Sequence, residues 1–364
     1  MFYFLSQFSS DISGLNIFRY ITFRAGMAAV TTFLISVVIG PWFIRKLKEW
    51  NFGEKPVTGG GRAEALGAAH LESKRNIPTM GGILIVGSIL AAMLLWGNLK
   101  NPYVLLTLMT MLWLGGVGFA DDYIKLSGMN KNGMRCRTKL LWQLFLATIV
   151  SFYIYMRPEV MTTLDVPFLK GVILDLGIFY ILFVMAVVVG TSNAVNLTDG
   201  LDGLAIGCTL FVALTLGVLS YVSGHTGFSQ YLLIPYIEGA GELTVFCAAM
   251  AGASLGFLWF NSHPAEVFMG DVGALALGGT LGIIAVFIKK ELLLVVLGGV
   301  FVWEALSVMI QVASFKTTGR RIFLCSPFHH HLQKINWKES KIVIRFWIVG
   351  IILAMLTLTT LKIR

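Results

Sequence analysis

The sequence has little charge and few cysteines. Only 13% of its 364 residues are Asp, Glu, Lys or Arg, whereas soluble domains carry about 25%. The first fifteen residues lack the basic segment of a cleavable signal peptide. The cysteines show no metal or redox spacing, so we interpret them as the free thiols of a reducing compartment. The composition therefore excludes a soluble globular domain. The four cysteines are Cys136, Cys208, Cys247 and Cys325.

Long apolar runs make up most of the sequence. Hydrophobic residues make up 56% of the chain, and the mean hydropathy is +0.79. A helix that crosses a bilayer needs about 20 mostly apolar residues. The sequence therefore predicts an all-α polytopic membrane protein with about ten transmembrane helices, forming a single domain over residues 1–364. The predicted spans are 20–44, 78–97, 102–120, 140–157, 172–190, 203–222, 243–260, 272–288, 292–314 and 342–361.

The connectors between these runs differ in positive charge. The chain has a net charge of +9. The odd-numbered connectors hold nineteen Lys and Arg residues, and the even-numbered connectors hold five. Cytoplasmic loops carry an excess of Lys and Arg. The asymmetry therefore predicts that the odd connectors face the cytoplasm and that both termini lie outside.

The odd connectors also carry every unusual polar cluster. These clusters hold five Asp residues, several Asn residues and three consecutive His residues, and the even connectors have nothing comparable. We therefore expect one membrane face to carry the functional chemistry. The clusters are Asp121-Asp122, Asn196 to Asp202, Asn261-Ser262-His263, Met269-Gly270-Asp271 and Pro327 to His331.

Adjacent carboxylates stand at the predicted end of the third span. Asp121 and Asp122 repel one another, and the dipole at a helix C-terminus disfavours both. A solvated pair marking a helix end is one interpretation, and a bound cation, either Lys125 or a divalent metal, is the other. Asp199, Asp202 and Asp271 are expected at the same depth. Phosphoryl transfer requires this set of groups: Mg²⁺ bound by oxygen ligands, lysines that bind the phosphates, and a carboxylate that activates a nucleophile.

Several other residues allow two interpretations. Asn196 to Asp202 contains ordinary helix-capping residues, yet its two Asp residues would share one helical face. The histidines could contact substrate or belong to a solvated loop, and zinc is disfavoured because three consecutive His cannot face one ion. Phe268 could stack on a nucleobase or anchor the interface. Glu304 is a mid-span carboxylate without an assigned role, and Gln311 follows on a similar face.

Six motifs occur in the order typical of one enzyme family. The chain resembles the phospho-N-acetylmuramoyl-pentapeptide transferases of the polyprenyl-phosphate N-acetylhexosamine-1-phosphate transferase superfamily over essentially its whole length. It departs from the family at Asn76-Ile77, where Gly-Thr is usual. The motifs are Pro78 to Gly82, Asp121 to Lys125, Asn193 to Gly203, Phe257 to Asn261, Phe268 to Gly273 and Pro327 to Leu332.

The resemblance implies an activity and its partners. The family transfers phospho-MurNAc-pentapeptide from UDP to undecaprenyl phosphate, and the products are lipid I and UMP. It uses Mg²⁺, works as a homodimer in the bacterial inner membrane, and has its active site on the cytoplasmic face. A GlcNAc-1-phosphate transferase of the same superfamily is the alternative enzyme. A secondary transporter is a further alternative, disfavoured because transport sites lie near the midplane.

The resemblance also implies roles for individual residues. Asp271 is implied as the Mg²⁺ ligand, and Asp121 and Asp122 as the catalytic pair at the lipid phosphate. Phe268 is implied to stack on uracil. The other implied catalytic residues are His329 and His330. The residues predicted to bind substrate are Lys74, Thr79, Lys125, Lys139, Asn196, Asp199, Gly200, Leu201, Asp202, Asn261, Phe268 and Gln311.

Overall fold

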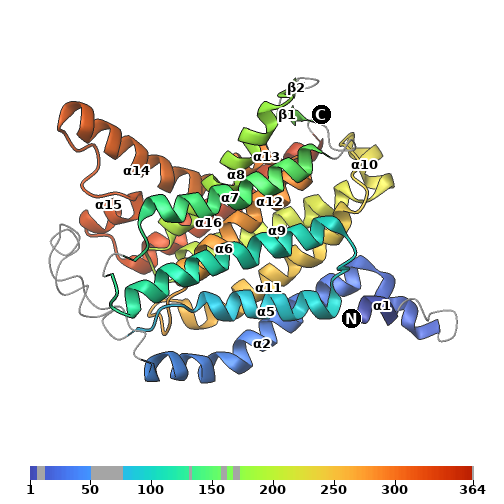
Figure 1. The fold of residues 1–364 in the computed structure, drawn as a ribbon, viewed down its shortest axis with the longest axis horizontal. Helices are drawn as coiled ribbons and strands as arrows, with labels where there is room; N and C mark the ends of the chain where they lie inside the picture. The colour runs from blue at the N-terminus through green and yellow to red at the C-terminus, as the bar shows by residue number, and fades with distance from the viewer. Residues whose placement is uncertain (6–12, 51–76, 131–132, 157–161, 167–172, 363–364) are drawn as a thin grey trace.

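The computed structural model describes residues 1–5, 13–50, 77–130, 133–156, 162–166 and 173–362. Long helices form one bundle (Figure 1). Each of the ten predicted apolar runs forms a helix. Among the described residues, nine helices are long and apolar enough to cross a membrane, and the tenth, α5, has 15 residues. The ten are α2 (Ile21–Glu49), α5 (Gly82–Trp96), α6 (Pro102–Leu126), α7 (Cys136–Tyr155), α8 (Phe179–Thr198), α9 (Leu204–Ser223), α11 (Leu243–Asn261), α12 (Gly270–Phe287), α14 (Gly299–Thr318) and α16 (Glu339–Thr359).

Short elements join the long helices. Strands β1 and β2 pair antiparallel, with Leu164 opposite Leu174. All four cysteines are free thiols, as the sequence predicts. The short elements are α1 (Phe2–Leu5), η2 (Ser13–Arg19), β1 (Thr163–Asp165), β2 (Ile173–Asp175), α10 (Thr226–Leu232), η3 (Ala240–Glu242), α13 (Glu291–Leu297), α15 (Phe328–Lys334) and η4 (Thr360–Lys362).

The core of the bundle is built from α9, α11 and α12. In the most apolar window of α12, 89% of the residues are buried, against 78% for α9 and 72% for the α11 segment. The same fraction is 28% for α2 and α16 and 22% for α14, so these helices present most of their apolar surface outward. A helix that exposes apolar residues on the outside of a bundle suits a lipid environment. The chain is a multi-pass membrane protein.

Small residues let the core helices approach closely. A side chain at Gly252 on α11 would collide with the backbone of Ala29 on α2. A side chain at Gly278 on α12 would meet the carbonyl oxygen of Thr191 on α8 at 2.6 Å. Both glycines belong to stretches with a small residue every fourth position, a pattern that favours close helix packing in membranes.

The structure corrects three sequence-based boundaries. The predicted span 292–314 is divided at Gly298 into α13 and α14. The predicted span 172–190 begins with strand β2, and its helix α8 continues to Thr198, so that Asn196 lies in a helical turn rather than in a connector. The hairpin was not expected in an all-α chain. Hydrophobicity alone could not place these breaks, because it does not encode the local backbone geometry on which they depend.

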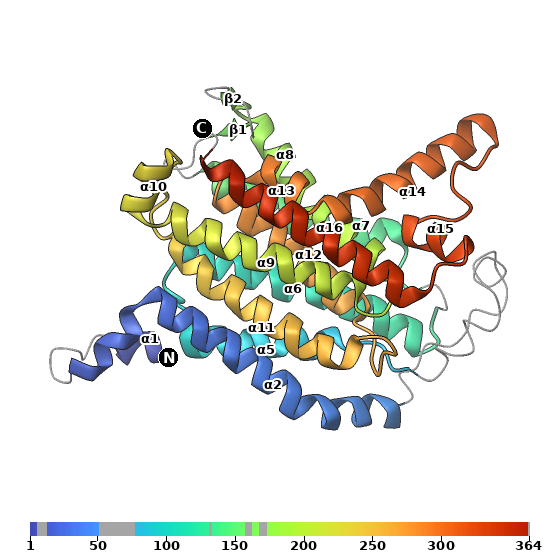
Figure 2. The ribbon, with the colours of Figure 1, turned by 180° about the vertical axis from the view of Figure 1, so that it is seen from behind.

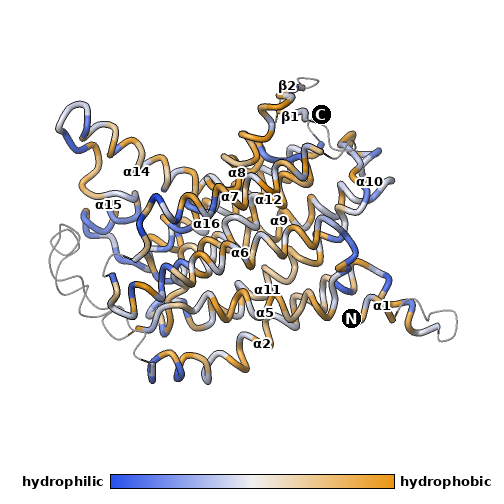
Figure 3. Tube along the Cα trace, in the orientation of Figure 1, coloured by the Kyte–Doolittle hydropathy of each residue, from blue (hydrophilic) through white to orange (hydrophobic). Residues whose placement is uncertain are grey.

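The polar motifs gather at one end of the bundle, and both termini lie at the other (Figures 1 and 2). We call the first the motif end. It comprises the C-terminal ends of α6 and α8, the N-terminal end of α12, and α15. Hydrophilic residues collect towards the two ends, and hydrophobic residues cover the helices between them (Figure 3). Helix α14 leans away from the bundle at this end, with α15 beside it (Figures 1 and 2).

Candidate active site

Three carboxylates meet at the motif end. Asp121 and Asp122 lie in the last two turns of α6, and Asp271 lies in the first turn of α12. One oxygen from each lies within 4.8 Å of the others. The two helix ends approach because position 118 is a glycine, where any side chain would collide with the carbonyl of Asp271. Asp121 and Asp122 are buried, with 3% and 4% of their surface exposed.

Two lysines hold these carboxylates together. The Lys125 ammonium lies 2.8 Å from Asp121 Oδ2 and 3.0 Å from Asp271 Oδ2. The Lys139 ammonium, from α7, lies 2.6 Å from Asp271 Oδ2 and 3.4 Å from Asp121 Oδ2. Two ammonium groups facing three carboxylates leave one negative charge. The acidic pair at the unfavourable end of α6 is thus offset by lysines from two helices.

Backbone hydrogen bonds fix the carboxylates further. Asp121 Oδ1 accepts a hydrogen bond from the Met134 amide at 2.6 Å. Asp122 Oδ2 accepts one from the Val272 amide at 3.3 Å, at the N-terminus of α12. Each Asp of the pair therefore has a different environment. Asp121 faces both lysines and the segment before α7, whereas Asp122 faces α12 and lies 3.7 Å from the Lys125 ammonium.

The segment before α5 pairs with the segment before α12. The Phe268 amide donates to the Pro78 carbonyl, and the Gly81 amide donates to the Phe268 carbonyl, both at 2.8 Å. This pairing brings Thr79 to Gly270, beside Asp122. A Cβ at position 270 would lie 2.9 Å from Thr79 Oγ1 and 2.6 Å from Asp122 Oδ2. Two motifs separated by almost two hundred residues in sequence thus form one wall of the site.

The loop between α8 and α9 is joined to the loop between α11 and α12. Asn261 Oδ1 accepts from the Gly203 amide at 3.0 Å, and its Nδ2 donates to the Val267 carbonyl at 2.8 Å. Asp202 Oδ2 lies 3.0 Å from His263 Nδ1 and accepts from the Ala265 amide at 3.2 Å. Asn261 and Asp202 therefore shape the loops that a substrate would meet.

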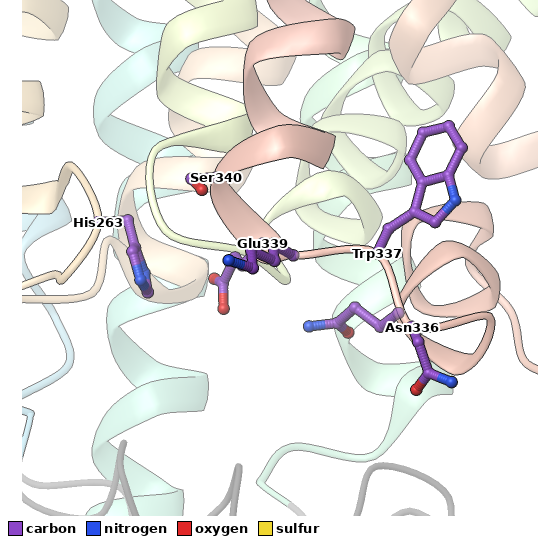
Figure 4. Close-up of a pocket in the computed structure, with 7 residues that line it drawn as sticks. His263, Asn336, Trp337, Glu339 and Ser340 are labelled. Carbon is purple, nitrogen blue, oxygen red and sulfur yellow. The ribbon is translucent and has the colours of Figure 1, made fainter.

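Glu339, at the start of α16, contacts the same loop. Its carboxylate accepts a hydrogen bond from the Asp202 amide at 2.9 Å. Beside it lies a hollow of about 530 Å³. Figure 4 shows His263 and Glu339 on one side of this hollow, and Asn336 and Trp337 further along. Asp202, His263 and Glu339 each place one ligand-type atom within 4.8 Å of the others, in a second polar group at the motif end.

The three histidines face three different partners. His329 Nδ1 lies 3.0 Å from Glu304 Oε2 on α14. His330 Nδ1 lies 2.8 Å from Gln333 Oε1 on its own helix. His331 Nδ1 accepts from the Leu324 amide at 3.2 Å. Three separate groups thus hold the Nδ1 atoms of the three rings.

The structure places most of the predicted site residues at the motif end. In the α8–α9 loop, Asp199 caps α8 and is half-buried, Leu201 is buried, and a side chain at Gly200 would collide with His329. Gln311 is further along α14, where its side-chain amide binds the backbone of Ile322 and Phe323. Lys74 lies outside the described residues.

Sequence reasoning left one carboxylate without a role and missed another. Glu304 was singled out by its position inside a predicted span, and the structure pairs it with His329. Glu339 gave no signal, because an acidic residue in the first turn of a helix is ordinary.

Comparisons with known proteins agree with the sequence motifs. The model for "Glycosyl transferase family 4" matches residues 104–289, and "Phospho-N-acetylmuramoyl-pentapeptide-transferase signature 1" matches residues 74–86. Three curated relatives bear the name phospho-N-acetylmuramoyl-pentapeptide-transferase. The protein from Thermodesulfovibrio yellowstonii is 50% identical over 363 residues, covering 99% of both chains. Those from Desulforapulum autotrophicum and Neisseria gonorrhoeae are 47% and 48% identical, each covering 100% of both chains.

Proposed function

The chain belongs to the phospho-N-acetylmuramoyl-pentapeptide-transferase family, and we propose that it transfers phospho-MurNAc-pentapeptide from UDP to undecaprenyl phosphate in peptidoglycan synthesis. The products are lipid I and UMP. The supporting observation is the cluster of Asp121, Asp122 and Asp271 with two lysines, in a chain 50% identical to a relative of that name. Oxygen ligands and cations in one buried cluster suit phosphoryl transfer.

The reaction exchanges one phosphoanhydride bond for another. An oxygen of the lipid phosphate attacks the phosphorus that carries MurNAc. The bond from that phosphorus to the bridging oxygen of UMP breaks, and UMP leaves with the electron pair. Any proton on the lipid phosphate passes to Asp121 or Asp122, which lie where a lipid phosphate at the motif end would arrive. The protein's part is to position the two phosphates and to balance their charge.

The carboxylate cluster fits a hard divalent cation. Mg²⁺ takes oxygen ligands, usually one or two carboxylates with phosphates and waters. Asp271 would hold the ion, and Asp121 and Asp122 lie close enough to share it. When bound, Mg²⁺ would neutralise the oxygens of the nucleotide diphosphate. Lys125 and Lys139 contact the same carboxylates and provide the cations nearest to an incoming phosphate.

The nucleotide part of the substrate is assigned to the neighbouring loops. Phe268 precedes Asp271 by three residues and is half-buried, and its ring is assigned to stack on uracil beside the diphosphate. Asn196, in the last turn of α8, and Asp199 and Gly200, in the α8–α9 loop, are assigned to the same substrate region, and Asp202 and Asn261 hold that loop in place.

The membrane placement follows from charge. The excess of Lys and Arg in the odd connectors orients the motif end towards the cytoplasm of the inner membrane. The nucleotide substrate then reaches the site from solution and the lipid reaches it laterally from the bilayer. We expect the enzyme to work as a homodimer, as its family implies.

Purified enzyme tests the proposal directly. UDP-MurNAc-pentapeptide and UDP-GlcNAc are supplied side by side with undecaprenyl phosphate and Mg²⁺, and UMP release and lipid products are measured. Turnover of the first substrate with little of the second is expected. The Asp122→Asn variant serves as the inactive control. Preference for UDP-GlcNAc would assign the chain to the other branch of the superfamily, and substrate flux across vesicles without turnover would favour a transporter.

A further inference from the structure

Glu304 is a fully buried carboxylate, and in the described part of the chain its side chain forms hydrogen bonds with His329 alone. Its side chain is 0% exposed. Its oxygens lie 3.0 Å from His329 Nδ1 and accept a hydrogen bond from the His329 amide at 3.2 Å. Among the described residues, no Lys or Arg pairs with it. A buried carboxylate is costly unless it is paired, so its position needs an explanation beyond chain packing.

The second nitrogen of His329 has no partner. The side chain of His329 is also fully buried. Its Nε2 makes no hydrogen bond in the described part of the molecule. This atom points at Gly200, where any Cβ would collide with it. Buried polar atoms are nearly always satisfied, so an orphaned one indicates a missing ligand or a catalytic role.

We infer that Glu304 is a positioning residue for the transfer reaction, and that it holds His329 so that Nε2 meets a phosphate oxygen of the nucleotide substrate. The Glu304 carboxylate accepts a hydrogen bond from His329 Nδ1–H. This bond fixes the orientation of the ring and leaves Nε2 for the substrate. Gly200 has no side chain, so the α8–α9 loop can lie directly against Nε2. The inference rests on the proposed function, which places the nucleotide at the α8–α9 loop.

A purely structural role is the rival explanation. Glu304 also binds the backbone amide of His329, and it could merely fasten α15 to α14. Glu304→Gln distinguishes the two explanations, because glutamine keeps an acceptor oxygen but loses the charge. Glu291→Gln is the matched control. Glu291, the first residue of α13, is also a buried carboxylate, 3% exposed, and it accepts a hydrogen bond from the Tyr180 hydroxyl at 2.6 Å, away from the motif end.

The test is a double-mutant cycle on the full-length enzyme in detergent. Glu304→Gln, His329→Gln and the double variant are compared with wild type for kcat, KM and thermal midpoint. Partners that orient a functional histidine typically matter by about 10–100-fold. We expect Glu304→Gln to lower kcat by about that factor with KM for the nucleotide substrate changed less than about threefold. In the His329→Gln background it should have no further effect, because the residue acts through the ring.

Three results would overturn the inference. These are wild-type kcat in Glu304→Gln, an equal loss in the presence and absence of His329, or an equal loss of kcat in Glu291→Gln. If Glu304→Gln does not fold, Gly200→Ala provides the second route. With Glu304 intact, its methyl group should displace His329 and lower kcat, and unchanged kcat there would contradict the inference. Wild-type enzyme without any turnover would instead count against the proposed function.

Discussion

Gly270, the first residue of α12, packs against Asp122, so its replacement by alanine should change the position of this carboxylate. Its φ is +72°, a left-handed conformation that costs an L-residue about 1–2 kcal/mol. The added Cβ would lie 2.6 Å from Asp122 Oδ2, about 0.8 Å closer than ordinary van der Waals contact. Asp122 is held by the Val272 amide and cannot yield without losing that bond.

The expected result of Gly270→Ala is a large loss of rate with a small loss of stability. A displacement near 1 Å at a catalytic group can cost on the order of 100-fold, so we expect kcat to fall about 10–100-fold. The strain should lower the thermal midpoint by only a few degrees. The assay measures UMP release with both substrates saturating, and a thermal scan in detergent follows unfolding.

Gly128→Ala is the matched control for this prediction. Gly128 follows α6 and has a φ of +76°, so alanine suffers nearly the same backbone strain there. A Cβ at this position would meet nothing within 4 Å. Gly128→Ala should therefore lose similar stability and keep its rate. Equal kcat values in the two variants would refute the reasoning that Asp122 must keep its position.

Three further predictions concern single side chains of the site. Asp271→Asn should raise the Mg²⁺ concentration needed for half-maximal activity by at least about tenfold, and an unchanged Mg²⁺ titration would contradict its assignment as a ligand. Phe268→Ala should weaken binding of the nucleotide substrate by about 10–100-fold and leave binding of the lipid unchanged, if the ring stacks on uracil. An unchanged KM for the UDP-sugar would instead indicate that Phe268 anchors the chain at the membrane interface. Asp122→Asn should lose turnover but still bind the nucleotide substrate in calorimetry. A stoichiometric release of UMP from wild-type enzyme without lipid would instead indicate a covalent intermediate on an Asp.

Most of the fold could be predicted because hydrophobicity determines it. Every predicted apolar run contributes to one of the ten long helices. The sequence also grouped the polar motifs correctly at one end. It could not locate the break at Gly298 or the β1–β2 hairpin, since these depend on local backbone geometry that hydrophobicity does not encode.

The composition of the site was harder to predict than its location. Asp121, Asp122 and Asp271 come together as the sequence suggested, because both helix ends reach the same depth. Contacts between side chains of distant segments were not accessible. Nothing in the sequence joins Glu304 to His329, which depends on α15 folding back beside α14. Asp202 and Asn261 were predicted to bind substrate, and the structure adds a loop-joining role that spacing could not reveal.

Charge balance gives a reason for a divalent cation that is independent of family likeness. With all three Asp carboxylates ionised, the two ammonium groups of Lys125 and Lys139 leave the cluster with one formal negative charge. Both proposed substrates are phosphate anions, and a negative cluster repels them. If the lysines turned to the phosphates, they would leave three close carboxylates uncompensated. An added divalent cation would satisfy both sets of oxygens. We therefore expect Mg²⁺ and nucleotide to bind cooperatively, with the lysines exchanging their carboxylate partners for phosphate as the ion takes their place.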